Sequence, residues 1–198
     1  MQQINSTEMN NLLFKFLSKY IELTDEEKSI VFRLSSIKEY KKGSILLSEG
    51  EVAKECYFLL DGGLMSYYII DGENKITDFF LDQDSVIPLS YSTNNPSEHY
   101  LECIEDSIIA IGTNERMEKI LKSVPKLAKL APEYLSDQLI SQKVKYNQLK
   151  KLTPEERYKK LQSSSPHLLN RVPQYMIASY LGIKPETLSR IRNRIHNQ

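Results

Sequence analysis

The hydrophobic positions of the chain are spaced first as in helices, then as in strands, and then as in helices again. Residues 8–36 carry apolar side chains at helical spacing, among them Leu12, Leu13 and Phe16, and so predict helical structure. Thr24 and Glu27 have the capping-box spacing that begins a second helix there. Between residues 37 and 112, short apolar runs alternate with breaks rich in Gly, Asp and Asn. That pattern predicts a small antiparallel sandwich or barrel.

From residue 114 onward the spacing is helical again, and one stretch has a coiled-coil pattern. Five residues recur at alternating intervals of four and three, which gives an a/d seam about two heptads long: Leu135, Leu139, Gln142, Tyr146 and Leu149. Two interpretations stay open on this spacing. The helix packs on its own β-domain, or it pairs with a second copy in a parallel dimer with Gln142 as a polar register position.

A new helix begins at Thr153-Pro154-Glu155-Glu156, where Thr153 and Glu156 have capping-box spacing and Pro154 suits the first helical position. The fold class is therefore α+β, with an N-terminal antiparallel sandwich or barrel, a long helix and an all-α domain. We place the sensor-like β-domain with its flanking helices at 1–124, the dimerisation helix at 125–152 and an all-α domain that contains a helix-turn-helix at 153–198.

The segment 173–195 has the pattern of a helix-turn-helix. Five apolar residues at suitable spacing predict the small core that two crossing helices share: Ile177, Leu181, Ile183, Leu188 and Ile191. Gly182 permits the positive φ that ends the first helix, and Pro185 presets φ at the start of the second. Such a turn presents the start of the second helix to the DNA major groove. The alternative is a plain helical hairpin in a protein–protein module.

The second of these helices carries polar side chains suited to DNA. Glu186, Ser189 and Arg190 fall on one outward face, at i, i+3 and i+4. Arg190 suits guanine and Glu186 suits cytosine. We assign further DNA contacts to Lys184, Thr187, Arg192 and Arg194.

The distribution of charge supports a nucleic-acid partner, although the net charge is zero. Residues 153–198 hold eight basic and three acidic residues, so this segment carries +5 and the rest of the chain carries −5. A basic segment on an acidic body is expected where one small domain meets phosphate. A solvated helical face is the alternative explanation of the same charges.

Several stretches resemble the CRP/FNR superfamily of bacterial regulators, and the resemblance covers nearly the whole chain. They are Lys41-Lys42-Gly43-Ser44-Ile45-Leu46 and Glu49-Gly50-Glu51, Glu102-Cys103-Ile104-Glu105-Asp106-Ser107, and Glu186-Thr187-Leu188-Ser189-Arg190. The resemblance implies that the β-domain is an antiparallel β-roll of the cyclic-nucleotide-binding type and that the long helix is a dimer helix. It also implies a cytoplasmic homodimer that binds a palindromic operator, with RNA polymerase as a further candidate partner. The Glu-x-x-Ser-Arg order resembles the branch that reads a TTGAT-type half-site. Pro185 stands where other members carry another base-reading arginine.

The chain departs from the cyclic-nucleotide-binding members of that family. Their phosphate cassette has a Gly-Glu pair and, about ten residues later, an arginine that neutralises the phosphate. Here the pair appears as Ile87-Pro88, and Pro88 has no N–H to donate. Glu98, followed by His99, stands about where the arginine belongs. We therefore expect a degenerate effector pocket at Ile87, Pro88, Glu98 and His99, no tight cyclic AMP or cyclic GMP binding, and an unknown effector. A cyclic-nucleotide-responsive regulator is the alternative.

Other function classes find little support in the sequence. It has no run of 18 apolar residues, no Gly-x-Gly-x-x-Gly or P-loop, and no nucleophile elbow. The histidines are scattered, and Cys56 and Cys103 lack metal-ligand spacing and lie among apolar neighbours. We expect reduced, buried thiols, no metal, no cofactor, no enzymatic activity and no membrane partner. A β-roll interaction module without DNA binding is a further alternative.

Overall fold

The computed structural model describes residues 5–197, apart from the side chains of Ala131, Glu133, Tyr134, Leu135 and Gln138. The chain divides into two compact units. We call them the roll unit, within Met1–Ser66 and Phe79–Tyr134, and the helical unit, within Tyr67–Asp78 and Leu135–Gln198.

Two capped helices begin the roll unit, α1 (Ser6–Leu17) and α2 (Asp25–Leu34). At α2 the Thr24 hydroxyl accepts from the Glu27 N–H at 3.3 Å, and the Glu27 carboxylate accepts from the Thr24 N–H at 2.7 Å. Asn5 and Glu8 form the same reciprocal pair at α1. Each box satisfies two N–H groups that a helix start otherwise leaves unpaired. The predicted helical structure in the N-terminal segment is confirmed, and so is the predicted capping box of Thr24 and Glu27.

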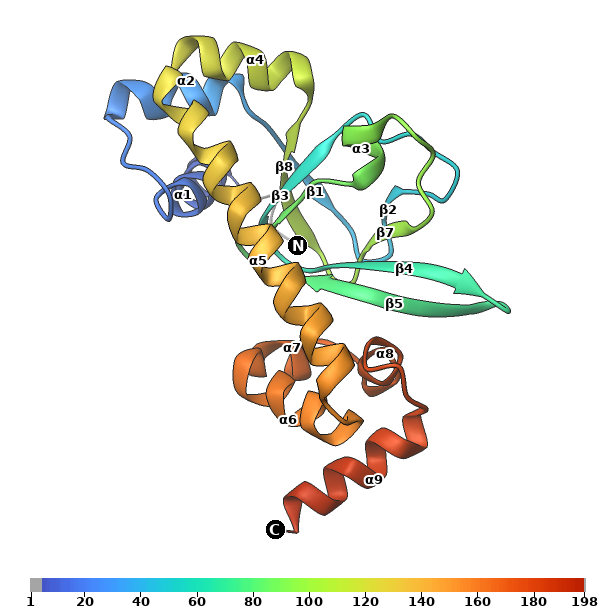
Figure 1. The fold of residues 1–198 in the computed structure, drawn as a ribbon. Helices are drawn as coiled ribbons and strands as arrows, with labels where there is room; N and C mark the ends of the chain where they lie inside the picture. The colour runs from blue at the N-terminus through green and yellow to red at the C-terminus, as the bar shows by residue number, and fades with distance from the viewer. Residues whose placement is uncertain (1–4, 198) are drawn as a thin grey trace. The chain divides into compact units, whose positions relative to one another are not determined.

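Eight short strands follow and form two four-stranded sheets (Figure 1). The first has the order β1-β8-β3-β6, with β1 (Ser36–Tyr40), β8 (Ser107–Gly112), β3 (Cys56–Asp61) and β6 (Ser85–Val86). The second has the order β2-β7-β4-β5, with β2 (Ile45–Leu47), β7 (Tyr100–Cys103), β4 (Leu64–Ile70) and β5 (Glu73–Phe80). The pairs β1–β8, β3–β8, β3–β6 and β2–β7 are antiparallel. The predicted antiparallel β-roll is confirmed.

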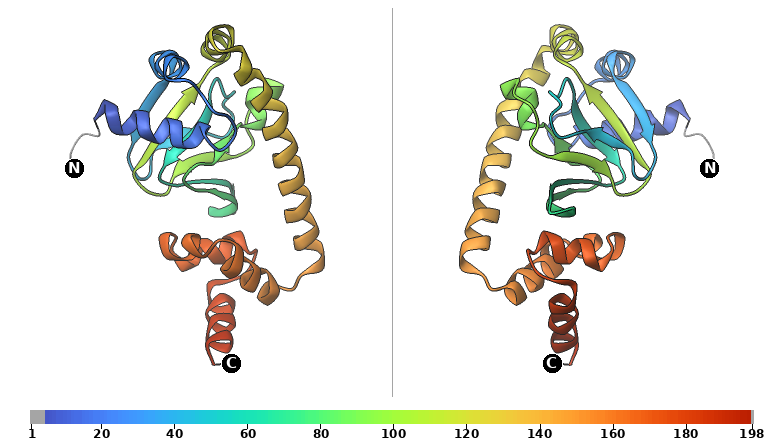
Figure 2. Two further views of the ribbon diagram at one scale, coloured as in Figure 1. Left: turned by 90° about the vertical axis from the view of Figure 1, so that its left-hand side faces the viewer. Right: turned by 90° about the vertical axis from the view of Figure 1, so that its right-hand side faces the viewer.

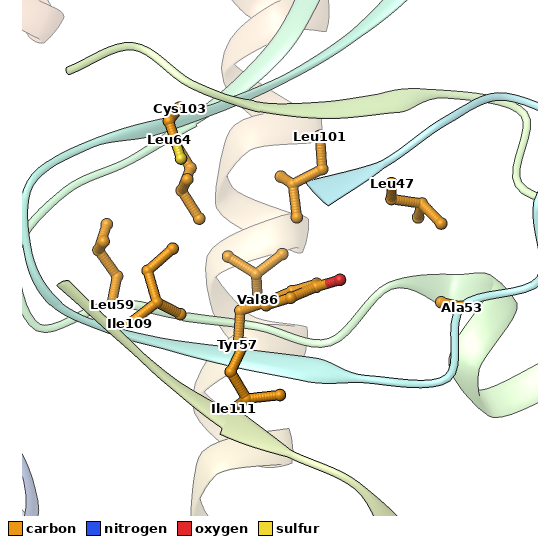
Figure 3. Close-up of a cluster of buried hydrophobic side chains, with 10 residues drawn as sticks. All are labelled: Leu47, Ala53, Tyr57, Leu59, Leu64, Val86, Leu101, Cys103, Ile109 and Ile111. Atoms are coloured by element: carbon orange, nitrogen blue, oxygen red, sulfur yellow. The ribbon is translucent and has the colours of Figure 1, made fainter. Parts of the chain in front are cut away.

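The interior of the roll is a closely packed apolar cluster, drawn in Figure 3. Both sheets contribute to it, because alternate side chains of each strand point inward. Its buried members are Leu47, Ala53, Tyr57, Leu59, Leu64, Val86, Leu101, Cys103, Ile109 and Ile111.

A second apolar cluster joins the helices to the outer face of the first sheet. In it α1 packs on β3, and α2 packs on α4 (Asn114–Ser123), as Figure 2 shows. The 3-10 helix η1 (Pro125–Lys129) follows α4 and contributes Leu127 to this cluster. The flanking helices therefore cover one face of the roll. A short helix, α3 (Leu89–Thr93), follows β6.

The C-terminal part of the chain is helical, as predicted. Its helices are α5 (Leu130–Lys151), α6 (Pro154–Ser164), α7 (Pro166–Arg171), α8 (Gln174–Tyr180) and α9 (Pro185–His196). Thr153 and Glu156 form the predicted capping box at the start of α6. Within the described part of the chain, no helix has both the length and the apolar character needed to cross a membrane.

Candidate functional site

Helices α8 and α9 meet over a small buried core. Ile177 and Ala178 on α8 and Leu188 and Ile191 on α9 are buried. Leu181 at the end of α8 is also buried, and Ile183 in the turn is half-buried. Ala178 is fully enclosed, and only a small side chain at such a position allows two helices to cross closely. The predicted core of a helix-turn-helix is confirmed, with Ile183 at its edge.

The turn between the two helices has the predicted backbone. Gly182 has φ +67°, a left-handed value that side chains with a Cβ adopt at a cost. The Ile183 N–H donates to the Ala178 carbonyl at 3.0 Å, which satisfies one of the last carbonyls of α8. Pro185 then occupies the first turn of α9, where its missing N–H costs no hydrogen bond.

Arg157 on α6 links this turn to the rest of the helical unit through hydrogen bonds. Its Nη2 donates to the Leu181 carbonyl at 2.8 Å, and its Nη1 donates to the Leu152 carbonyl at 3.3 Å. The side chain is half-buried. This cation contributes to the basic balance of residues 153–198, but its geometry assigns it to holding α6 against the end of α8.

The outer surface of α9 and its N-cap residue, Lys184, carry the side chains that the sequence pattern assigned to DNA. All seven are exposed: Lys184, Glu186, Thr187, Ser189, Arg190, Arg192 and Arg194. Asn193 is also exposed and lies on the face of Glu186 and Arg190, seven and three residues further along the helix. Sequence reasoning missed Asn193, although the same helical spacing could have identified it.

The two later arginines of α9 have different surroundings. Arg194 Nη1 lies 3.3 Å from Glu155 Oε2, and Lys159 Nζ lies 3.0 Å from Glu155 Oε1. The Lys159 hydrogen bond holds the pKa of the Glu155 carboxyl below its usual range, because it outweighs the opposing effect of burial. The Arg194 charge lowers this pKa further, by a smaller amount than burial raises it. Arg192 instead lines a cavity of about 590 Å³ between α6 and α9.

The tip of the β4–β5 hairpin belongs to the helical unit and contacts α8. The Ser179 hydroxyl donates to the Asn74 carbonyl at 2.8 Å and accepts from the Ile76 N–H at 3.0 Å. Lys145 Nζ on α5 lies 2.7 Å from Asp78 Oδ1 at the base of the same segment. These contacts join residues between 67 and 105 positions apart, so local sequence patterns carried no signal for them.

The predicted dimer seam is exposed where the structure describes it. Leu139 is 73% exposed, Tyr146 57% and Leu149 61%, and Gln142 is exposed between them. The Leu135 side chain lies outside the described residues. Large apolar side chains so open to water on one helix are unusual for a surface that stays solvated.

The predicted effector-pocket residues lie around α3 and the loop before β7. Pro88 is buried and precedes α3, Ile87 and Glu98 are exposed, and His99 is half-buried. The loop is held by the neighbouring turn, because the Gly50 N–H donates to the Ser97 carbonyl at 2.8 Å and the Ser97 N–H donates to the Glu51 carbonyl at 2.7 Å. The start of α3 has no side-chain cap.

The roll interior offers little to an anionic ligand. No lysine or arginine is buried between residues 37 and 124, all of which the structure describes. Tyr57 points into the interior among Leu47, Val86 and Leu101 (Figure 3), and its hydroxyl donates to the Leu46 carbonyl at 2.9 Å. Burial and then the nearby Glu55 carboxylate raise the pKa of the Tyr57 phenol. A phosphate would find apolar walls there and no buried cation.

Both cysteines are free thiols buried in the roll, as predicted. Burial raises the pKa of the Cys56 and Cys103 thiols to about 11. They are therefore protonated at neutral pH and poor nucleophiles. Among the described residues, no three His, Cys, Asp or Glu side chains come together as a metal site.

Comparison with known proteins agrees with this architecture. Residues 37–124 match the cyclic nucleotide-binding domain family. Among solved structures, FixK2 from Bradyrhizobium japonicum is 21% identical, with a TM-score of 0.65 over 83% of this chain and 85% of that one. A CooA mutant from Carboxydothermus hydrogenoformans is 15% identical, with a TM-score of 0.66 over 91% and 83%. The Thermus thermophilus catabolite activator protein is 15% identical, with a TM-score of 0.54 over 90% and 86%. None of the curated protein sequences matches significantly.

Proposed function

We propose that this chain, which has a cyclic nucleotide-binding-type domain and the fold of the CRP/FNR regulators, is a sequence-specific DNA-binding transcription regulator. The observation that carries the proposal is the well-packed α8–α9 pair, whose second helix exposes Glu186, Ser189 and Arg190 on one face. A helix of this kind fits the major groove and presents its N-terminal residues to base edges.

The base contacts follow from the chemistry of that face. Arg190 can donate bidentately to O6 and N7 of guanine, and Glu186 can accept from the N4 amino group of cytosine. We expect a half-site of the TTGAT type, in which a G·C pair lies beside A·T pairs. Pro185 offers no side-chain donor, so one contact of the related regulators is missing.

Selection of bound duplexes from a random pool tests this function. The wild-type protein should recover one palindromic consensus with two half-sites about 10 base pairs apart from centre to centre. The Arg190→Ala variant should bind about 5- to 150-fold more weakly, equivalent to about 1–3 kcal/mol, and should lose its preference at the guanine. If this variant selects an unchanged consensus, Arg190 only pairs with Glu186 along the helix and does not read a base.

The palindrome requires a homodimer, and we assign the interface to α5. The exposed apolar residues Leu139, Tyr146 and Leu149, with Gln142 between them, would form a seam between two copies. We place this dimer in the cytoplasm, with RNA polymerase as a further partner at promoters. An enzymatic activity finds no support in the described side chains.

A cyclic nucleotide is the second candidate for the effector, because residues 37–124 match that domain family. The side chains favour the opposite conclusion. Pro88 removes an N–H donor, Glu98 brings a negative charge where an anion would need a cation, and the roll contains no buried lysine or arginine. We infer that DNA binding is not gated by cyclic AMP or cyclic GMP. Calorimetry with each nucleotide tests this directly.

A further inference from the structure

A polar groove lies between α6 and α9 in the helical unit. Its α9 wall includes Ser189 and Arg192, which are already assigned to DNA, but no role has been assigned to its α6 wall. The groove has a volume of about 590 Å³. Tyr158 and Gln162, one turn apart, form its wall on α6, and Ser189, Arg192 and His196 form its wall on α9. Asn193 and Ile195 complete the lining. A guanidinium, an imidazole, two amides and two hydroxyl groups thus belong to the residues that line this groove, and none of these residues carries a carboxylate.

The position of the groove on α9 indicates which part of a DNA duplex it can contact. Glu186 and Arg190 face outward, and Leu188 and Ile191 face the protein core. Arg192 and His196 lie on the flank between these two faces, by the helical period of 3.6 residues. When a helix occupies the major groove, which is about 12 Å wide, its flanks face the two sugar–phosphate backbones. The groove therefore opens toward one backbone.

On the opposite flank of α9, the basic side chain is paired within the protein. There Arg194 is paired with the Glu155 carboxylate, so its charge is partly neutralised within the protein. Arg192, two residues earlier, lines the groove together with hydrogen-bonding side chains, and none of the lining residues is acidic. Donors grouped in this way suit a phosphodiester, which has only acceptor oxygens.

We propose that the α6–α9 groove binds the phosphodiester backbone of one operator strand. Arg192 pairs with a phosphate, and Gln162 and Ser189 donate hydrogen bonds to phosphate oxygens from the two walls. This assignment makes α6 part of the DNA-binding surface, through a residue outside the helix-turn-helix. It rests on the proposed DNA-binding function, and it extends that function to a specific backbone contact.

Gln162→Glu is the most direct test, because it keeps the shape of an exposed side chain and places a carboxylate in the groove. Lys160→Gln is the matched control. It also lowers the charge by one on an exposed position of α6, but two residues away and so on the opposite side of the helix. Fluorescence anisotropy with the duplex selected by the wild type, and with a random duplex, should show about tenfold weaker binding of both by Gln162→Glu. Lys160→Gln should lose less than about threefold.

Replacing single phosphates of the operator by neutral methylphosphonates then locates the contact. One or two adjacent replacements in each half-site should weaken the wild type and leave the already weakened Arg192→Ala variant unchanged. Arg192→Ala should also lower the slope of log affinity against log salt by about one. Thermal melting of each variant checks that it is folded.

The possible outcomes distinguish failure of the groove proposal from failure of the DNA-binding function on which it depends. If the wild type binds its operator but Gln162→Glu matches Lys160→Gln, and no methylphosphonate couples to Arg192, the groove is not a backbone site and the regulator proposal stands. If the wild type binds no DNA, both proposals are wrong. Coupling of the Arg192 and Gln162 variants to the same phosphates supports the inference.

Discussion

Replacing Leu139 by Asp should convert the protein from a dimer to a monomer. Full burial of a leucine side chain stabilises by about 1.5–3 kcal/mol. Leu139 is 73% exposed in the single chain, so its burial in a symmetric seam would contribute about 1–2 kcal/mol per protomer and about 2–4 kcal/mol per dimer. Loss of that contribution alone weakens dimerisation by about 30- to 1,000-fold. Two carboxylates facing each other in an apolar seam add several kcal/mol more.

Ile140 provides a matched control on the same helix. It is 61% exposed and apolar, but it is rotated by about 100° from Leu139 and so lies outside the predicted seam. Sedimentation velocity over a concentration series should show a dimer for Ile140→Asp and a monomer for Leu139→Asp. Circular dichroism should show equal helix content in both. A dimeric Leu139→Asp variant would refute the seam, and a monomeric Ile140→Asp variant beside it would place the interface on the other face of α5.

Three further predictions concern the roll and the hairpin. Calorimetry should give dissociation constants above about 10 μM for cyclic AMP and cyclic GMP, a limit that corresponds to a binding free energy of roughly −7 kcal/mol. Tighter binding by the wild type would show that Glu98 does not prevent phosphate binding. Cys56 and Cys103 should react slowly with a thiol reagent at pH 8. Because burial raises the pKa of both thiols from 9.0 to about 11, the free energy of unfolding should fall as the pH rises through that window; rapid labelling of the folded protein would contradict this. Ser179→Ala should lower the free energy of unfolding by about 1–2 kcal/mol and speed hydrogen exchange at the Ile76 amide, whereas unchanged exchange there would mean that the Ser179 contact is not maintained in solution.

The sequence alone determined the features that depend on short-range geometry. The Thr24–Glu27 and Thr153–Glu156 capping boxes are hydrogen-bond pairs across three residues, so their spacing specifies them before any tertiary contact forms. The Gly182 turn is equally local, because its positive φ is set by what one residue tolerates. Alternation of apolar runs and turn residues was enough to predict a small antiparallel sandwich or barrel, although it could not give the strand order.

The roles of residues that look alike in the sequence depend on contacts that the folded chain makes between distant positions. Arg157 entered the charge balance as one more cation, yet it is bonded to two carbonyls, one of them 24 positions away. Ser179 contacts a hairpin 105 residues earlier, and no periodicity encodes such a contact. Arg192 and Arg194 are chemically identical and two positions apart on one helix. Because that step turns the side chain by about 200°, one pairs with Glu155 and the other lines the groove of α6 and α9.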